Sequence, residues 1–319
     1  NFGSIVAISV ITSFLASMTL LPALITVFKP RFIVGSGTTE TSPSSSGFGK
    51  ASALALTLGI GLASLGSENV NAEELPTGRS IIEKLNARDD GEHVTSHVKM
   101  KMVDRRGKER VRETKTYRKY FGEEKRTVLF YLSPKNVKDT GFLTYDYPDL
   151  EVDDDQWLYL PALRKARRIS ASDRGDYFLG TDFSYEDIKK DGKMELGDYQ
   201  FESLEESIVD NISTIVVQAI PISEDIAKEL GYGKIHIWVD PSRWVTLKAD
   251  YWDIKMNPLK TLEVRDIRKI DGILTRHKLT INNHKTGHST EFLFSQVDYK
   301  APVDDKLFTR QALKRGARQ

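Results

Sequence analysis

A period-two pattern of apolar side chains, interrupted by short turns, limits the possible folds most strongly. Between Val94 and Met102, residues suited to a core alternate with polar residues, which is typical of a half-buried strand. Leu262–Ile270 and Ile273–Ile281 are joined only by Asp271-Gly272, a pair that favours a two-residue hairpin turn. Such connections are too short for a crossover helix, so neighbouring strands are expected to be antiparallel.

The same pattern predicts most of the chain after residue 90 to be strand. Helices are expected only at Gly78–Arg88, at Asp304–Lys314 and in one or two further short segments. We therefore expect a mainly β fold that forms one large curved antiparallel sheet or incomplete β-barrel. A few helices should cover its concave side and leave an apolar cavity. The other predicted strands are Glu109–Tyr120, Thr127–Leu132, Phe142–Tyr147, Gln156–Leu160, Phe201–Ser207, Ser213–Ile220, Ile235–Val239, Val245–Tyr251 and Glu291–Val297.

Composition excludes several classes of function. The 319 residues contain 46 Lys and Arg against 45 Asp and Glu, so the chain lacks the positive excess that nucleic-acid binding requires. With no cysteine, disulfides, thiolate metal sites, cysteine nucleophiles and acylation of a lipobox cysteine are all excluded. Nucleic acid is therefore not an expected partner.

The first 72 residues have a different character from the rest. Residues 2–28 carry no charge and exceed the ~20 residues that cross a bilayer, so residues 1–30 are predicted to be a transmembrane helix. Lys29 and Arg31 place its end on the cytoplasmic side. The stretch Met18–Leu24, MTLLPAL, resembles the end of the last membrane helix of MmpL-type resistance-nodulation-division permeases. The alternative is an ordinary hydrophobic anchor.

Two further segments complete this N-terminal part. Residues 31–50 are rich in Ser, Thr and Gly and are expected to be a flexible linker. Residues 51–72 combine an apolar run with the small residues Val70 and Ala72, as in a signal peptide with a cleavage site after Ala72. The alternative is a short, uncleaved membrane segment. Both interpretations place residues 73–319 outside the inner membrane, in the periplasm.

A long motif identifies a family that residues 73–319 resemble. DQWLYLPALRKARRIS at 155–170, followed by Ser172-Asp173-Arg174 and by GTDFSYED at 180–187, is similar to the pattern of LolA-like outer membrane lipoprotein-sorting proteins. The residues that carry the resemblance are Trp157, Tyr159, Pro161, Asp173, Arg174, Gly180, Thr181, Asp182, Phe183, Tyr185 and Asp187.

The resemblance implies a LolA/LolB-like incomplete β-barrel with a helical lid and a cavity for acyl chains. It also implies a non-enzymatic periplasmic carrier of a lipid or acylated protein between the inner and outer membranes, working with an MmpL-type permease. A sensor or adaptor that binds the same ligand without transferring it is the first alternative. No cofactor is implied, and the oligomeric state is left open.

Two groups of residues are candidates for ligand binding. A cavity for acyl chains gains affinity mainly from buried apolar area, at about 0.8 kcal/mol per methylene. Its predicted lining residues, which in the alternative only fill a core, are Met100, Met102, Leu247, Tyr251, Phe292 and Phe294. A basic cluster that could bind a phosphate or anionic headgroup consists of Arg164, Lys165, Arg167 and Arg168. The alternative is a structural network of these cations with Asp153, Asp154, Asp155, Asp173, Asp176 and Asp182.

Metal-dependent and hydrolytic functions have little support in the sequence. The pairs His93/His97 and His284/His288 lack a carboxylate at a familiar ligand spacing, so no metal site is predicted. The motifs of serine hydrolases, zinc proteases, P-loop enzymes and dinucleotide-binding enzymes are absent from the sequence. A noncanonical esterase or phospholipase that uses Ser170 or Ser172 is the second alternative to the carrier.

Overall fold

The computed structural model describes residues 75–149 and 152–316. The predicted membrane helix, the linker and the signal-like segment lie outside the described residues. Within the described residues, no helix is both long and apolar enough to cross a bilayer.

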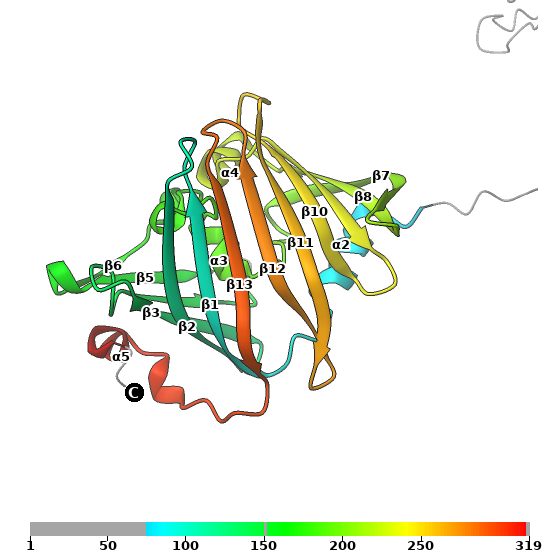
Figure 1. The fold of residues 1–319 in the computed structure, drawn as a ribbon. Coiled ribbons are helices and arrows are strands. Elements are labelled where there is room, and N and C mark those ends of the chain that lie inside the picture. Colours follow the sequence, from blue (N-terminus) through cyan, green and yellow to red (C-terminus); the bar gives the residue numbers. More distant parts are fainter. Residues whose placement is uncertain (1–74, 150–151, 317–319) are drawn as a thin grey trace, which may run out of the picture. The chain divides into compact units, whose positions relative to one another are not determined.

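Thirteen antiparallel strands form one sheet, in the order β6-β5-β4-β3-β2-β1-β13-β12-β11-β10-β9-β8-β7 (Figure 1). The sheet is strongly curved, and its two end strands, β6 and β7, do not pair with each other, so it stays open. This confirms the predicted fold class. The strands are β1 (His93–Val103), β2 (Glu109–Phe121), β3 (Glu124–Ser133), β4 (Gly141–Asp146), β5 (Asp155–Leu160), β6 (Lys165–Arg168), β7 (Tyr199–Val209), β8 (Ile212–Pro221), β9 (Lys234–Asp240), β10 (Val245–Trp252), β11 (Pro258–Ile270), β12 (Ile273–Asn283) and β13 (Ser289–Asp298).

Turn chemistry sets the register of the long hairpins. Asp271 and Gly272 both have positive φ, 52° and 90°, as a type I′ turn requires. The turn aligns Ile270 with Ile273 and continues the pairing to Lys260 and Asn283.

The helices are short and begin at side-chain caps. They are α2 (Gly78–Asn86), α3 (Tyr185–Lys190), α4 (Glu224–Leu230) and α5 (Arg310–Arg315), with short 3-10 turns at Pro161–Leu163, Ala171–Asp173, Phe178–Gly180 and Asp305–Leu307. α2 and α3 lie on the concave side of the sheet (Figure 1). Ile81, Ile82 and Leu85 of α2 are buried against strands β7 to β11. Gly78 permits this approach, because a Cβ there would lie 2.6 Å from the backbone of Glu202 in β7.

Strand β3 is buried on both faces. Leu129 and Tyr131 belong to the core of the concave side, whereas Val128 and Phe130 pack against Phe308 and other residues of the C-terminal segment. Two-sided burial explains why VLFYL in β3 is continuously apolar and does not alternate.

Two predictions of secondary structure need correction. Residues 165–168 of the basic cluster form the edge strand β6, which the alternating pattern did not identify because its side chains are mostly charged. The helix predicted at 304–314 is divided, because Thr309 adopts extended backbone angles (φ −131°, ψ 149°) and caps α5 by accepting a hydrogen bond from the Ala312 amide.

Candidate functional site

A cavity of about 230 Å³ lies within the concave side of the sheet. Its walls include side chains of β1 to β3 and of β9 to β13, together with α2 and several residues between 183 and 199. Residues 174–198, which contain α3 and which we call the covering segment, cross this side of the sheet (Figure 1). The site is therefore a strand wall closed by one long irregular segment.

Four of the six residues predicted to line an acyl cavity do line it: Met100, Tyr251, Phe292 and Phe294. They come from three strands, β1, β10 and β13, that the chain order separates widely. Phe183 of the covering segment stacks on Phe292 with 4.2 Å between ring centroids. The covering segment thus contacts the apolar wall directly.

Met102 and Leu247 are buried but are not among the cavity-lining residues. Met102 pairs with Thr290, whose hydroxyl donates to Asp182 of the covering segment. That end of β1 therefore lies beneath the covering segment and not beside the cavity. Leu247 is the extra residue of a β-bulge in the pairing of β9 with β10.

The family motif anchors the covering segment to strands β11 to β13. Ser184 and Asp187 form a capping box that starts α3. Asp182 accepts hydrogen bonds from the Thr290 hydroxyl (2.7 Å) and the Asn283 amide (3.1 Å). Lys260 Nζ donates to the Asp182 carbonyl oxygen (2.8 Å) and to Asp187 Oδ2 (2.9 Å).

Lys260 is the centre of this anchor. Its side chain is fully buried, so its charge must be compensated inside the protein. Asp187 supplies a carboxylate, and the rings of Tyr251 and Tyr232 lie 5.0 and 5.1 Å from Nζ. Burial, then the charge of Asp187, raises the pKa of Tyr232, whose protonated hydroxyl donates to that carboxylate.

A second anchor joins the covering segment to β4 and to the chain that precedes β5. Lys190 Nζ lies 2.6 Å from Asp146 and 2.5 Å from Glu195, and Lys125 lies 2.8 Å from Asp146. Burial alone would raise the pKa of Asp146, but Lys125 and Lys190 hold it well below its usual range. Lys189 pairs with Asp154 and with Glu186, both of which are largely buried.

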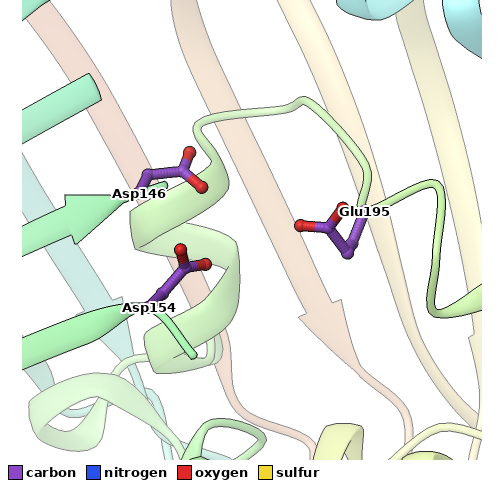
Figure 2. A group of neighbouring side chains, drawn as sticks. All are labelled: Asp146, Asp154 and Glu195. Carbon is purple, nitrogen blue, oxygen red and sulfur yellow. The ribbon is translucent and has the colours of Figure 1, made fainter. Parts of the chain in front are cut away.

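Asp146, Asp154 and Glu195 lie close enough together to suggest a cation site (Figure 2). Figure 2 shows Asp146 and Asp154 beside α3 and Glu195 on the chain that follows it. Lys190 is within 3.5 Å of all three carboxylates. The ammonium group already supplies the charge that a metal would bring, so the geometry favours an ion network over metal binding.

A third anchor fixes both ends of the covering segment. Arg174 Nη1 lies 2.9 Å from Asp198, and its Nη2 lies 3.1 Å from Glu229 in α4. Arg174 begins the covering segment and Asp198 ends it. Arg174, one of the motif residues, therefore has a structural role in this arrangement.

The remaining motif residues pack or shape the backbone around these anchors. Trp157 and Tyr159 face the C-terminal segment, and Tyr185 packs between Phe142 and Phe178. The Thr181 hydroxyl donates to the Phe178 carbonyl. Pro161 opens a 3-10 turn, Asp173 accepts a hydrogen bond from Ser172, and Gly180 has a φ of 78°.

The basic cluster is an exposed edge of the sheet, away from the residues that line the cavity. Arg164, Lys165, Arg167 and Arg168 are all exposed. Of the six aspartates considered as partners, only Asp155 forms an ion pair with the cluster within the described residues, at 2.6 Å from Arg168. Asp154 instead pairs with Lys189, and the carboxylate of Asp182 lies within hydrogen-bond distance of His288 Nδ1. A headgroup role for this cluster remains a prediction.

The geometry does not support catalysis by Ser170 or Ser172. The Ser172 hydroxyl donates to Ser170 (2.9 Å) and to Asp173 (3.2 Å). No histidine is a hydrogen-bond partner of either serine in the described part of the chain, whereas an activated serine needs a general base. His284 and His288 contact Thr261 and Asp182, respectively.

Sequence reasoning missed the buried lysines that hold the covering segment. Lys260 lies on the same face of β11 as Leu262 and Val264, which pack in the core. A charged residue at an inward position was the available signal, since such a charge requires a buried partner. The partners themselves lie 73 or more residues away in the chain and could not be identified.

Comparisons with known proteins agree with this architecture. A family model described as "Uncharacterized protein" matches residues 123–315. A DUF1329 family protein from Desulfovibrio piger is 30% identical, with a TM-score of 0.68, and the match covers 74% of this chain and 97% of that one. No curated protein sequence matches the chain.

Two other solved structures share the fold. A putative outer membrane lipoprotein-sorting protein domain from Vibrio parahaemolyticus is 28% identical, with a TM-score of 0.67, over 74% of this chain and 98% of that one. A LolA superfamily protein from Nitrosomonas europaea is 19% identical, with a TM-score of 0.58, over 75% of this chain and 100% of that one. The incomplete-barrel architecture is therefore common to all three.

Proposed function

Because the chain belongs to the DUF1329 family, we propose that it is a non-enzymatic carrier that shields acyl chains of a lipid or of a lipidated protein. The observation that carries the proposal is the apolar cavity beneath the covering segment. Two features of the comparisons support it, namely the lipoprotein-sorting description of the Vibrio structure and the LolA superfamily fold of the Nitrosomonas structure.

The size of the cavity indicates how such a carrier would load. A volume of about 230 Å³ falls below the roughly 300–1,000 Å³ typical of ligand sites. A long acyl chain therefore requires the site to widen, and the covering segment is the wall without strand pairing to the rest of the sheet. Loading then corresponds to a lid motion, and release to its reversal.

The proposal extends to location and partner. Residues 1–30 resemble the end of an MmpL-type permease, and residues 51–72 have the character of an export signal. A chain organised in this way would hold the carrier on the periplasmic side of the inner membrane. There it would accept a lipid or acylated protein from the permease and deliver it toward the outer membrane.

Photocrosslinking tests whether the cavity binds acyl chains. The full chain is reconstituted in vesicles containing a phospholipid with a photoactivatable group at the end of one chain, and adducts are mapped by mass spectrometry. We expect adducts on β1 and β13 near Met100 and Phe292. Filling the cavity with Ala249→Phe should reduce them several-fold, whereas Ile208→Phe at an exposed site should not.

A correctly folded chain with adducts only in residues 1–72 would contradict the proposal. Transfer distinguishes the carrier from the adaptor. If the protein binds the lipid but does not speed its exchange between donor and acceptor vesicles, the adaptor alternative replaces the carrier.

A further inference from the structure

Four cations converge at one end of the cavity, from four different parts of the chain. Arg88 follows α2, and its guanidinium donates to the carbonyl of Leu274 (2.7 Å), two residues before Arg276 in β12. The Arg276 guanidinium donates to Asp191 of the covering segment. All of these cations are lining residues, and the full set is Arg88, Arg118, Lys193 and Arg276.

The carboxylates at this end do not balance these charges. Asp90 lies 3.4 Å from both Arg118 and Lys193, and Asp191 lies 2.7 Å from Arg276. Two carboxylates thus face four cations. The other acidic lining residues each pair with a different cation: Glu186 with Lys189, Asp187 with Lys260, Glu195 with Lys190, and Asp198 with Arg174.

Arg88 has the least compensation. Its guanidinium donates to two carbonyls, of Asp89 (3.3 Å) and Leu274 (2.7 Å), and no carboxylate lies within ion-pair distance among the described residues. Burial, then the positive charge of Arg276, lowers the pKa of Arg88. The carboxylates of Asp90 and Asp191 offset this lowering only in part, so an anion held between Arg88 and Arg276 would stabilise both charges.

This end, which we call the open end, includes the most exposed lining residues. Asp191 and Gly192 are exposed, whereas Val98, Met100 and Phe292 farther along the wall are buried. On β1, Val94 lies opposite Arg118 and Met100 is six residues farther on, a distance of about 20 Å at the usual rise of a strand. One acyl chain occupies about 15 Å, half of a bilayer's hydrocarbon core.

We propose that the open end of the cavity binds the anionic headgroup, a carboxylate or a phosphate ester, of an amphiphile whose chain lies along β1 and β13. The inference rests on the proposed function and adds the chemical class of the ligand. The headgroup lies between Arg88 and Arg276, and the chain points toward Met100. Neutral amphiphiles of equal length bind more weakly.

A pair of probes separates this inference from the proposed function. The full chain in detergent-free nanodiscs is titrated with a fluorescent fatty acid and with the matching fatty alcohol, which has the same chain and no charge at neutral pH. We expect the acid to bind about tenfold more tightly. Arg88→Gln and Arg276→Gln should each abolish most of that preference, measured as the ratio of acid to alcohol affinity in the same variant.

Three controls complete the test. Arg79→Gln changes the same residue type in α2, the helix that precedes Arg88, at a position outside the cavity, and should keep the preference. Arg88→Lys should restore part of it if charge is what matters, and thermal melts show whether each variant is folded. Inorganic phosphate should compete poorly, because it has no chain to bury.

Each outcome has one meaning. If neither probe binds to folded protein, the proposed function fails. If acid and alcohol bind equally well, the carrier remains and the headgroup site is overturned. If inorganic phosphate competes as well as the fatty acid, the cations form a site for free anions, and the inference of an amphiphile is wrong.

Discussion

The two walls of the cavity are stabilised by different interactions. The strand wall buries apolar side chains such as Met100, Leu279 and Phe292, and its backbone is paired from one strand to the next. The covering segment contains only two short helical turns and is attached through buried ion pairs. Apolar packing is non-directional and tolerant, whereas a buried ion pair requires a particular geometry.

The difference has a consequence for loading. Asp182 and Asp187 attach the covering segment to strands β11 to β13. Lys189 and Lys190 attach it to β4 and to the chain that precedes β5. Between Asp191 and Gly197 the segment is held by cations of the open end, by Glu195 in the second anchor and by two hydrogen bonds between Asn86 and the backbone of Met194. Widening the cavity by moving the covering segment therefore requires these directional polar contacts to break, in addition to the separation of apolar surfaces.

The largest effect is expected from removing the buried lysine that joins the two walls. Lys260→Met leaves the half-buried carboxylate of Asp187 with only the Tyr232 hydroxyl and the α3 cap, so it should lower the free energy of unfolding by about 3–5 kcal/mol. Denaturant unfolding of the full chain measures this. Lys255→Met, at an exposed turn position, should change it by less than about 0.5 kcal/mol.

A double variant sharpens this first test. Asp187→Asn removes the charge that Lys260→Met leaves unpaired, so the two changes together should cost less than the sum of each alone. Strict additivity would mean that the ion pair does not join the walls.

A smaller effect is expected at the second anchor, with a defined pH dependence. Asp146→Asn should cost about 1.5–3 kcal/mol at pH 7, because Lys190 keeps Glu195 as a partner and Lys125 keeps its hydrogen bond to the Lys190 carbonyl. The pKa of Asp146 is lower in the folded protein than in the unfolded chain, so its contribution is complete above about pH 4 and is lost as the pH falls further. The difference between wild type and variant should therefore shrink from pH 5 to pH 2. A difference that is independent of pH would contradict the assignment.

The sequence was informative wherever a local rule acts. Alternation located most of the strands, Asp271-Gly272 set the register of the hairpin of β11 and β12, and Ile81, Ile82 and Leu85 identified α2. β3 was found in spite of its unbroken apolar run, but the burial of its second face depends on Phe308, 178 residues after Phe130. Local patterns do not contain that information.

The site was less predictable than the fold, for a physical reason. An apolar residue on an inward position of a strand needs no particular partner, so Met100 and Phe292 could be chosen from alternation alone. Ion pairs depend on partners that are brought together only by folding. The exposed Arg164–Arg168 region was predicted as a headgroup site because its charges are adjacent in sequence. Arg88 and Arg276, in contrast, both line the cavity although they are 188 residues apart in the chain.

The smallest effect is expected at that exposed edge. Arg168 pairs with Asp155 at 2.6 Å, but its side chain is 58% exposed, and ion pairs in such positions contribute about 0–1 kcal/mol. Arg168→Ala should therefore leave the free energy of unfolding nearly unchanged, and unfolding in low and high salt measures any residual contribution. A loss of unfolding free energy similar to that of Asp146→Asn would show that the edge strand is part of the anchoring network. Buried anchors and the exposed edge would then contribute alike to stability, which contradicts the comparison made here.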